Sequence, residues 1–350
     1  MTKPIALASL ATATPPHVLT QDMAVEIARD LFSHRFADFE RMVPVYANAG
    51  IRKRHFSLPL EWYFTPRGWP ERSQAYVEMA ERLFVETAKA ALAEAGLNGA
   101  DVDTVVTVSS TGIATPTLEA RVMGERGFRR DIQRVPVFGL GCAGGVTGLS
   151  LAARLAKSRP GTVVLMVTIE LCSLAFQPDV LTKANIVATA LFADGAAACV
   201  VRAGGEGEYA IEGAGEHTWP STLDIMGWQV DPLGFGVIFA RSIPPFVQKR
   251  MGAAADRILA GIGVERRDID RFVCHPGGAK VVSALETALD LGQGALDHER
   301  EVLADFGNMS APTVLFVLER VLKERKPERM FLSSLGPGFT ASGLSLAKAA

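Results

Sequence analysis

The chain has 350 residues, of which 48% are hydrophobic and 21% are charged, and its formal net charge is −2. This length allows one large or two medium domains, and the near-neutral charge gives no electrostatic signature of nucleic-acid or anionic-membrane binding. The residues after Met1 include one lysine and a short apolar run, which does not fit a signal peptide. No stretch approaches the ~20 apolar residues of a membrane span, so we expect a cytoplasmic protein without stable membrane association.

The cysteines and histidines are spread along the chain without the spacing of metal ligands. There are four cysteines and six histidines, and neither a CxxC motif nor a paired-histidine motif occurs. We therefore expect a reducing compartment and a site that uses neither a metal nor a cofactor. The cysteines are Cys142, Cys172, Cys199 and Cys274.

The first hundred residues predict a strand followed by helices. Residues 5–14 read as a strand that ends before Pro15-Pro16. Residues 21–32 follow Thr20, a residue type that caps helices, and show a helical pattern. A long helix is predicted for residues 73–95, because apolar residues recur there at helical spacing until Gly96. Its apolar stripe indicates core packing rather than a ligand surface.

Four compact apolar runs predict strands that are covered on both faces, at residues 102–108, 135–138, 163–169 and 196–201. Helical patterns lie between most of these runs, and the alternation predicts an α/β fold with layered sheets and helices. The glycine-rich residues 204–208 are the clearest boundary. They divide the chain into an N-terminal half, residues 1–203, and a C-terminal half, residues 204–350.

The two halves repeat each other. The segment at Asp101 matches the segment at Asp268, an offset of 167 (268 − 101). The turn with Cys142 matches the turn with Asn308, an offset of 166 (308 − 142), and the apolar run from Val163 recurs after a further 167 residues (330 − 163). Three near-equal offsets indicate a duplication. It predicts that the halves face each other across a pseudo-twofold axis, with the two turns at a central site.

Cys142 lies in Phe-Gly-Leu-Gly-Cys-Ala-Gly-Gly, between a predicted strand and a helical pattern. A thiol in such a turn faces the free N–H groups of a helix N-terminus, which favour the thiolate. The flanking glycines let the backbone or a substrate come close. Free cysteine is also among the most buried residue types, so this residue alone fits a nucleophile or a core side chain about equally well.

His275 and Asn308 make Cys142 part of a predicted site. They lie in Cys-His-Pro-Gly-Gly and Gly-Asn-Met-Ser, two turns of the C-terminal half. An imidazole can stabilise a thiolate, and imidazole and carboxamide N–H groups can stabilise charge on a carbonyl oxygen. Either residue alone would more often be structural. Together with the cysteine they indicate acyl transfer through a thioester.

Further motifs follow one another in a characteristic order. They are the Cys142 turn, Ala-Leu-Phe-Ala-Asp-Gly-Ala-Ala-Ala at 190–198, His-Pro-Gly-Gly at 275–278, Gly-Asn-Met-Ser at 307–310 and Leu-Gly-Pro-Gly-Phe-Thr at 335–340. With these motifs the chain resembles a type III polyketide synthase, of the chalcone synthase-like branch of thiolase-fold condensing enzymes, over essentially its whole length. The resemblance implies a thiolase-like αβαβα layered fold built from two duplicated halves.

The family condenses malonyl-CoA iteratively, with decarboxylation, onto an acyl-CoA starter, and it uses no carrier protein. The resemblance implies that Cys142 attacks the starter thioester and holds the growing chain. It implies that His275 stabilises the thiolate and, with Asn308, binds the malonyl carbonyl, whose oxygen becomes enolate-like as carbon dioxide leaves. It also implies a homodimer. Thr115 aligns with the family residue that reaches into the partner's cavity, although by itself it reads as an ordinary loop threonine.

Two residues align with the gatekeepers of the family, which stand between the CoA tunnel and the reaction cavity. Phe192 matches the aromatic gatekeeper, although a core phenylalanine would fit the same context. The second gatekeeper falls in the segment that begins at Leu233, and the alignment selects Val237 rather than Phe235.

Starter choice depends on the substrate pocket, to which Ser310 also belongs by resemblance. Cys172 and Ala175 lie close to positions where the plant enzymes have cavity-lining threonines. Smaller and less polar side chains leave room for an aliphatic chain, and residues 51–63 resemble bacterial members that make alkylpyrones or alkylresorcinols. We therefore expect a medium- or long-chain fatty acyl-CoA starter. Lactone formation and aldol closure both stay open.

The family holds the CoA phosphates with basic residues near the mouth of the tunnel. Arginine suits bidentate phosphate contacts, whereas a basic run is otherwise usually a solvated face. Arg41 aligns best. About three inserted residues before Ile51 separate it from a basic run that begins at Arg52. The predicted CoA-binding residues are Arg41, Arg52, Lys53, Arg54, Gly277 and Gly278.

Three other functions stay open at this point. A β-ketoacyl-carrier-protein synthase of the initiating kind shares the Cys-His-Asn chemistry, but its histidine motif normally continues Gln-Ala-Asn, where this chain has Pro-Gly-Gly. A cysteine acyl-hydrolase with a G-x-C-x-G elbow would need glycine in place of Leu140. A non-catalytic acyl-CoA-binding protein is disfavoured because all three reactive side chains are present.

Overall fold

The computed structural model describes residues 4–204, 207–232 and 234–349. Nine strands in this part of the chain form one mixed sheet, in the order β11-β12-β13-β8-β1-β7-β6-β4-β5. Their bounds are Ile5–Ala13 for β1, Thr104–Val108 for β4, Gln133–Val137 for β5, Val163–Leu171 for β6, Asp194–Ala203 for β7, Tyr209–Thr218 for β8, Arg271–Cys274 for β11, Arg329–Gly336 for β12 and Thr340–Lys348 for β13.

The sheet repeats one arrangement on the two sides of its centre. On one side β4 and β6 run parallel, and β7 and β1 continue the sheet with antiparallel pairing. On the other side β11 and β12 run parallel, and β13 and β8 continue it in the same way. Three antiparallel pairs, from Ile5↔Ile211 to Leu7↔Tyr209, join the two sides. The strands matched by the sequence repeat thus hold equivalent places in the sheet.

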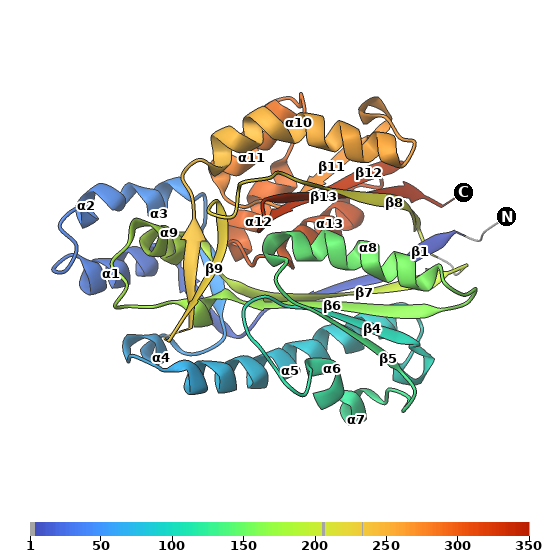
Figure 1. Cartoon of the computed structure of the whole chain (residues 1–350), viewed down its shortest axis with the longest axis horizontal. Coiled ribbons are helices and arrows are strands. Elements are labelled where there is room, and N and C mark those ends of the chain that lie inside the picture. Colours follow the sequence, from blue (N-terminus) through green and yellow to red (C-terminus); the bar gives the residue numbers. More distant parts are fainter. Residues whose placement is uncertain (1–3, 205–206, 233, 350) are drawn as a thin grey trace.

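Helices fill the space between the two halves of the sheet and cover both outer faces (Figure 1). α8 and α13 lie between the halves, α5 covers the outer face of the N-terminal strands, and α10 and α11 cover the outer face of the C-terminal strands. Their bounds are Trp69–Glu94 for α5, Gly144–Ala156 for α8, Ile243–Gly261 for α10, Ala279–Ala288 for α11 and Thr313–Glu324 for α13. The predicted αβαβα layering is confirmed.

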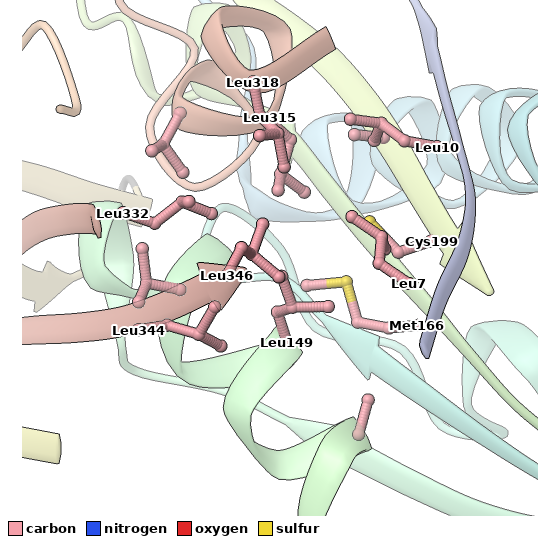
Figure 2. Packing of buried hydrophobic residues seen from close by; sticks show 14 of the residues in the cluster. Leu7, Leu10, Leu149, Met166, Cys199, Leu315, Leu318, Leu332, Leu344 and Leu346 are labelled. Carbon is pink, nitrogen blue, oxygen red and sulfur yellow. The ribbon is translucent and has the colours of Figure 1, made fainter. Parts of the chain in front are cut away.

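The middle layer is apolar toward both halves of the sheet. Leu149 of α8 and Leu315 and Leu318 of α13 are fully buried, and Figure 2 shows them among leucines of β1, β12 and β13. α8 comes close to the turn before α13, because a Cβ on Gly145 would lie 2.3 Å from Ala311 O. Since burying one leucine side chain contributes about 1.5–3 kcal/mol, this layer holds the two halves together.

The strand predictions are largely confirmed, with one error in burial. Every residue of β4 and β6 is buried, as their continuous apolar runs predicted. β5 is instead an edge strand and is largely exposed. Pro136 cannot donate a ladder hydrogen bond, which suits an edge, and Phe138 just after the strand is 55% exposed. The prediction that residues 135–138 are covered on both faces is therefore wrong.

The two helices predicted near the N-terminus are present. α1 spans Gln21–Phe32, and Met23 N donates to the Thr20 hydroxyl that caps it (3.3 Å). α5 begins four residues earlier than residue 73, since Pro70 is accommodated in its first turn. It ends at Glu94, just before Gly96, as predicted.

Short elements build the remainder of the molecule beside the sheet (Figure 1). β2 pairs with β3, and β9 pairs with β10. Their bounds and those of the short helices are His17–Thr20 for β2, Lys53–Phe56 for β3, Met226–Asp231 for β9, Gly234–Phe239 for β10, Phe39–Met42 for α2, Pro44–Asn48 for α3, Leu60–Phe64 for α4, Leu118–Arg121 for α6, Met123–Arg126 for α7, Lys183–Leu191 for α9 and Asp297–Phe306 for α12. No helix within the described ranges is long and apolar enough to cross a membrane.

Some predicted features fall on residues outside the described ranges. These are residues 1–3, residues 205 and 206 of the predicted boundary, Leu233 at the start of the second-gatekeeper segment, and residue 350. The division of the chain at residues 203 and 204 stays a prediction.

Candidate active site

Cys142 lies in a tight turn between β5 and α8. The single 3-10 turn Gly141–Ala143 leads directly into α8. Gly141 has a φ of 49°, and a Cβ on it would lie 2.7 Å from Pro337 Cδ, so this position requires glycine. The Cys142 side chain is buried at the N-terminal end of α8, where the sequence predicted it.

Burial controls the protonation of the cysteine and the histidine. Desolvation raises the pKa of Cys142 to about 12, although a hydrogen bond with Ser310 acts in the opposite direction. Burial therefore opposes the thiolate that a helix N-terminus favours. Desolvation also lowers the pKa of His275 to about 3. Thiol and imidazole are thus both uncharged at neutral pH.

His275 follows β11 and Asn308 follows α12, and both side chains are buried. Neither ring nitrogen of His275 has a hydrogen-bond partner within the described part of the chain. The Asn308 amide is held at both ends, because Ser310 N donates to its Oδ1 (2.8 Å) and its Nδ2 donates to Gly277 O (3.3 Å). A carboxamide has two N–H groups, so a second one is available for a ligand oxygen.

A chain of contacts joins the three predicted catalytic residues. Ser310 hydrogen-bonds the thiol of Cys142 through its side chain and the side chain of Asn308 through its N–H. Asn308 donates to Gly277 O, and a Cβ on Gly277 would lie 3.8 Å from Nε2 of His275. The structure therefore brings together the turns of both halves, as the duplication predicted. Such a site offers a nucleophile, a neutral base and two N–H donors.

Two connected spaces lie beside this site. The chamber lined by Cys142 has a volume of about 40 Å³, and an apolar cavity next to it has a volume of about 80 Å³. Ser310 lines the chamber, and Ala175 lines the apolar cavity. The side chains that line both spaces are Cys172, Phe192, Trp228 and Val237. These four shared side chains form the boundary between the chamber and the apolar cavity, which we call the passage.

The predicted gatekeepers lie at this passage. Phe192 follows α9 directly, and its ring stands edge-on against the ring of Phe239, with centroids 5.8 Å apart. Phe235, nearer the β9–β10 turn, packs on Trp69 and does not line the passage. Val237 does line it, as the alignment predicted. Sequence reasoning missed Phe239. This residue lies two positions after Val237 on β10, and residues at this spacing on a strand lie on one face, so the spacing could have identified it.

The apolar cavity extends from the passage toward α1, α4 and α9. Two of its polar side chains belong to one hydrogen-bonded chain: Tyr63 hydrogen-bonds Ser173 (2.7 Å), and Ser173 donates to the buried carboxylate of Asp194 (2.5 Å). Small side chains such as Ala188 leave its space open. The remaining lining is mostly aliphatic and aromatic, with Leu19, Ala24, Ile27, Ala28, Leu31, Phe32, Phe56, Leu60, Phe64 and Phe176. The chemistry of this lining suits an aliphatic group.

The basic residues predicted for CoA phosphates are dispersed. Arg41 is 86% exposed and pairs with Asp38 (3.4 Å), and Arg52 pairs with Asp305 (2.5 Å). Lys53 is exposed on β3. These three side chains lie at the surface: Arg41 on α2, Arg52 just before β3, and Lys53 on β3.

Arg54 is fully buried, and the structure contradicts its assignment to the CoA phosphates. Its Nη1 donates to Phe192 O (2.9 Å), and its guanidinium lies 5.5 Å from the ring centroid of Phe56. Desolvation lowers the pKa of Arg54 to about 10. Alternation along β3 turns this side chain inward, to the wall of the apolar cavity, while its neighbour Lys53 points out.

A large open groove lies on the other side of the histidine turn. Gly277 and Gly278 lead from His275 to the N-terminus of α11, which has no side-chain cap. The groove has a volume of about 540 Å³, and Lys280 is the one basic residue in its lining. The lining residues are Asn48, Pro244, Pro245, Gln248, Ala279, Lys280, Ser283, Ala284 and Thr287. A lysine beside a free helix N-terminus suits an anionic group. The sequence analysis considered only clustered basic residues and therefore missed Lys280.

The structure also places Thr115, which the sequence analysis predicted, and Trp228. Thr115 is exposed in the loop after β4. Trp228, which the sequence analysis missed, reaches the chamber, and its indole N–H donates to Ser110 O (2.8 Å).

No group of three or more histidine, cysteine, aspartate or glutamate side chains in the described ranges could hold a metal ion.

Glu170 is a buried acid next to the chamber, and sequence reasoning missed it as well. Its Oε2 accepts from Ser110 N (3.0 Å) and from the Thr111 hydroxyl (2.8 Å), and both of these residues line the chamber. Desolvation raises the pKa of Glu170 to about 8. An acidic residue inside the otherwise apolar run of β6 is the signal that could have found it.

Comparisons with known proteins agree over the whole chain. Family models described as the N-terminal and C-terminal domains of chalcone and stilbene synthases match residues 2–205 and 211–348. The 1,3,6,8-tetrahydroxynaphthalene synthase of Streptomyces peucetius subsp. caesius is 38% identical over 343 residues, which cover 96% of this chain and 91% of that protein. The putative chalcone synthase of Bacillus subtilis (strain 168) is 36% identical, covering 95% of this chain and 96% of that protein.

The solved structures lead to the same group. The 1,3,6,8-tetrahydroxynaphthalene synthase of Streptomyces coelicolor A3(2), described as a bacterial type III polyketide synthase, aligns with a TM-score of 0.93 at 28% identity. The alignment covers 99% of each chain. The similarity therefore includes both halves of the sheet and the elements beside it.

The raised pKa of Glu170 predicts a pH-dependent gain in stability for Glu170→Gln. The folded pKa of about 8 lies above the ordinary glutamate pKa of 4.5, so folding favours the protonated acid, and this carboxyl lowers stability as the pH rises from about 4.5 to 8. Glutamine is neutral at every pH. We expect the variant to melt at a higher temperature than the wild type at pH 8, with a smaller difference at pH 5. Glu86→Gln, an exposed position on α5, is the control; equal effects at both pH values would contradict the prediction.

Proposed function

Because the chain belongs to the chalcone and stilbene synthase family and is a type III polyketide synthase, we propose that it extends medium- or long-chain fatty acyl starters with malonyl-CoA. The products are alkylpyrones or alkylresorcinols. One observation carries this proposal: the chamber of Cys142 shares four lining side chains with a cavity lined mainly by aliphatic and aromatic side chains. Burial of each CH₂ group of an acyl tail there contributes about 0.8 kcal/mol.

Loading begins from the neutral thiol–imidazole state. As the starter thioester enters, His275 takes the proton of Cys142, and the thiolate attacks the carbonyl carbon. The tetrahedral intermediate then expels the CoA thiolate, which takes the proton from the imidazolium. The net result is transfer of the acyl group from CoA to Cys142. The imidazole has a lone pair that can take this proton, although the burial that lowers the pKa of His275 also makes it a weaker base.

Extension uses the same histidine together with Asn308. The N–H groups of these two side chains bind the thioester carbonyl of malonyl-CoA, and loss of carbon dioxide leaves an enolate whose oxygen they stabilise. The enolate carbon attacks the acyl group on Cys142, and the cysteine leaves as a thiolate. The new chain, now two carbons longer, is carried by CoA and returns to Cys142 for the next cycle.

We further propose that CoA enters from the groove that contains Lys280. Lys280, which lines this groove, lies five residues after His275 (280 − 275), and the lysine and the free N-terminus of α11 both attract phosphate. Gly277 and Gly278 lie between them and keep their predicted role as CoA-binding residues. Arg41, Arg52 and Lys53 keep their predicted roles as contacts for the CoA phosphates.

A homodimer is part of the same proposal. Thr115 is exposed and lies two residues after Ile113, which is 52% exposed, and Phe138 is another large apolar side chain on the surface. Apolar side chains that stay exposed in one protomer fit an interface. In the dimer Thr115 would reach the cavity of the partner.

The proposal is tested by product analysis with malonyl-CoA and a series of starters from acetyl-CoA to palmitoyl-CoA, without carrier protein. We expect triketide or tetraketide alkylpyrones or resorcinols, with the highest kcat/KM for an aliphatic starter of medium or long chain. Ala188→Phe, which fills the apolar cavity, should move this preference to short starters. Ala184→Phe, on the same helix but outside the lining, should leave it unchanged.

The same assay separates the alternatives. The name of the Streptomyces relative contains the product 1,3,6,8-tetrahydroxynaphthalene. If malonyl-CoA alone gives this compound as the main product, the starter is malonyl-CoA and not a fatty acyl-CoA. Product that appears only with carrier-bound malonate would indicate a single-condensation synthase. Free acid without malonyl consumption would indicate an acyl-hydrolase.

The division of roles predicts different defects for two substitutions. Cys142→Ala should abolish the acyl adduct, which mass spectrometry of the intact protein measures. Asn308→Ala should still load the starter but decarboxylate malonyl-CoA ~100- to 1000-fold more slowly, since one donor to the developing charge is lost. Cys199→Ala, a buried cysteine of β7, is the control and should behave like the wild type. The same defect in both site variants would contradict the assigned roles.

The entry route predicts a substrate-binding defect for Lys280→Ala. Loss of one phosphate contact should raise KM for malonyl-CoA by about 3- to 10-fold at low salt, with kcat nearly unchanged. The difference should shrink as ionic strength rises. Lys89→Ala, at an exposed position on α5, provides the matched control. An unchanged KM would place the CoA phosphates elsewhere.

A further inference from the structure

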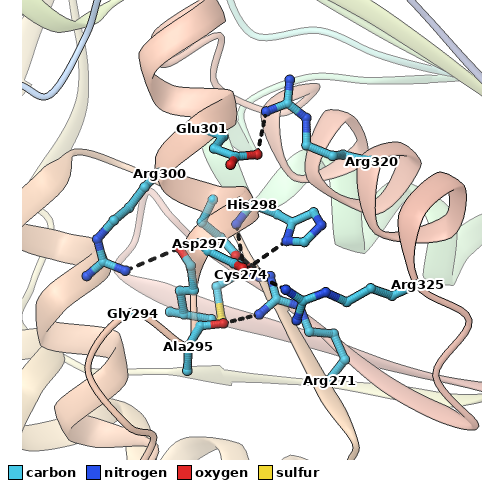
Figure 3. A network of polar contacts seen from close by, with 12 residues as sticks. Arg271, Cys274, Gly294, Ala295, Asp297, His298, Arg300, Glu301, Arg320 and Arg325 are labelled. Carbon is cyan, nitrogen blue, oxygen red and sulfur yellow. Dashed lines mark hydrogen bonds and ion pairs between the residues drawn. The ribbon is translucent and has the colours of Figure 1, made fainter.

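A buried ion pair lies directly behind the histidine turn. Glu299, near the start of α12, is fully buried, and its Oε2 lies 2.5 Å from Nη2 of Arg271, the first residue of β11. The arginine side chain is 7% exposed. Figure 3 shows Arg271 with Cys274, Ala295 and other residues of this polar network.

The second carboxylate oxygen of Glu299 holds the end of β11. Its Oε1 accepts a hydrogen bond from Cys274 N (2.9 Å), the amide that directly precedes His275. On the neighbouring strand Ser333 O accepts from His275 N (2.8 Å). Glu299 and β12 therefore accept hydrogen bonds from two successive amides, Cys274 N and His275 N. These two bonds set the point at which the backbone leaves the sheet.

The helix that carries Glu299 also leads to the asparagine. α12 ends at Phe306, and Gly307 N donates to Leu303 O (2.9 Å) at its C-terminus, immediately before Asn308. A helix of this length is stiff along its axis. One carboxylate thus ties the strand that ends at His275 to the helix that ends at Asn308, although the two residues are 33 positions apart (308 − 275).

Stability alone does not account for this arrangement. A buried ion pair often contributes no net stability, because desolvation of both charges offsets their attraction. Burial raises the pKa of Glu299 to about 7, which records that desolvation cost. The neighbouring pair Glu286–Arg300 gives a comparison: Glu286 accepts from Gly294 N and Leu296 N, so it holds the loop before α12, and among the described residues no hydrogen bond joins it to β11.

We propose that Glu299 is a positioning residue, which sets the distance between the imidazole of His275 and the carboxamide of Asn308 through its hydrogen bond to Cys274 N. The inference rests on the proposed function, in which these two side chains bind one malonyl carbonyl oxygen. Two donors must converge on that oxygen, and a shift of about 1 Å in one of them can cost ~100-fold in rate. Glu299 itself does not touch substrate.

The test compares two double variants in which an Arg–Glu pair is replaced by methionines. Arg271→Met/Glu299→Met removes the acceptor for Cys274 N, and Glu286→Met/Arg300→Met removes the neighbouring pair. Replacement of both charges is often neutral for stability, so both proteins should fold. We expect the first variant to lower kcat for malonyl-CoA decarboxylation by about 10- to 100-fold with KM within about 2-fold. The second should keep both constants within about 2-fold of the wild type.

A second measurement does not depend on turnover. The ¹⁵N resonances of the His275 imidazole should shift in the first double variant and stay in place in the second. If a methionine variant does not fold, Glu299→Gln and Glu286→Gln are compared in the same two assays. Equal effects of the two pairs, or a change in KM alone, would overturn the role of Glu299. A wild-type protein that does not decarboxylate malonyl-CoA would instead overturn the proposed function, and the positioning role with it.

Discussion

The close packing of α8 against the turn before α13 is the constraint on which the site depends. A side chain at Gly145 would strike Ala311 O, so the two central segments meet at backbone distance. Cys142 stands just before one of these segments, and Ser310 belongs to the other. Their contact exists because two duplicated halves bury the same helical layer between their sheets. A looser layer would separate the nucleophile of one half from the donors of the other.

Desolvation then sets the chemistry of the assembled site. Burial keeps the thiol of Cys142 and the imidazole of His275 uncharged, and it keeps the Glu170 carboxyl largely protonated near neutral pH. A low-dielectric chamber makes charge costly in the free protein and makes each N–H donor more effective once charge forms on a substrate. The same burial that opposes a resting thiolate thus favours stabilisation of an enolate oxygen.

Specificity depends on side chains that come from distant parts of the sequence. The passage is built from the end of β6, the end of α9 and the β9–β10 pair, and the cavity beyond it is closed by α1 and α4. Trp228 and Lys280 carry no motif that marks them, and only the packing of these elements shows that they face substrate spaces. Arg54 shows the opposite case: a basic run predicts a surface, but strand alternation turns its third member into the protein.

The sequence by itself determined the layered α/β fold, the duplication and the identity of the reactive turns, because these depend on local patterns: apolar periodicity, glycine positions and ordered motifs. The tertiary structure decided the ionisation of those residues, the exposure of β5, and the residues that line the passage and the groove. Burial, edge position and cavity shape come from contacts between segments far apart in the chain, and a sequence pattern specifies which residues are apolar but not which surfaces they share.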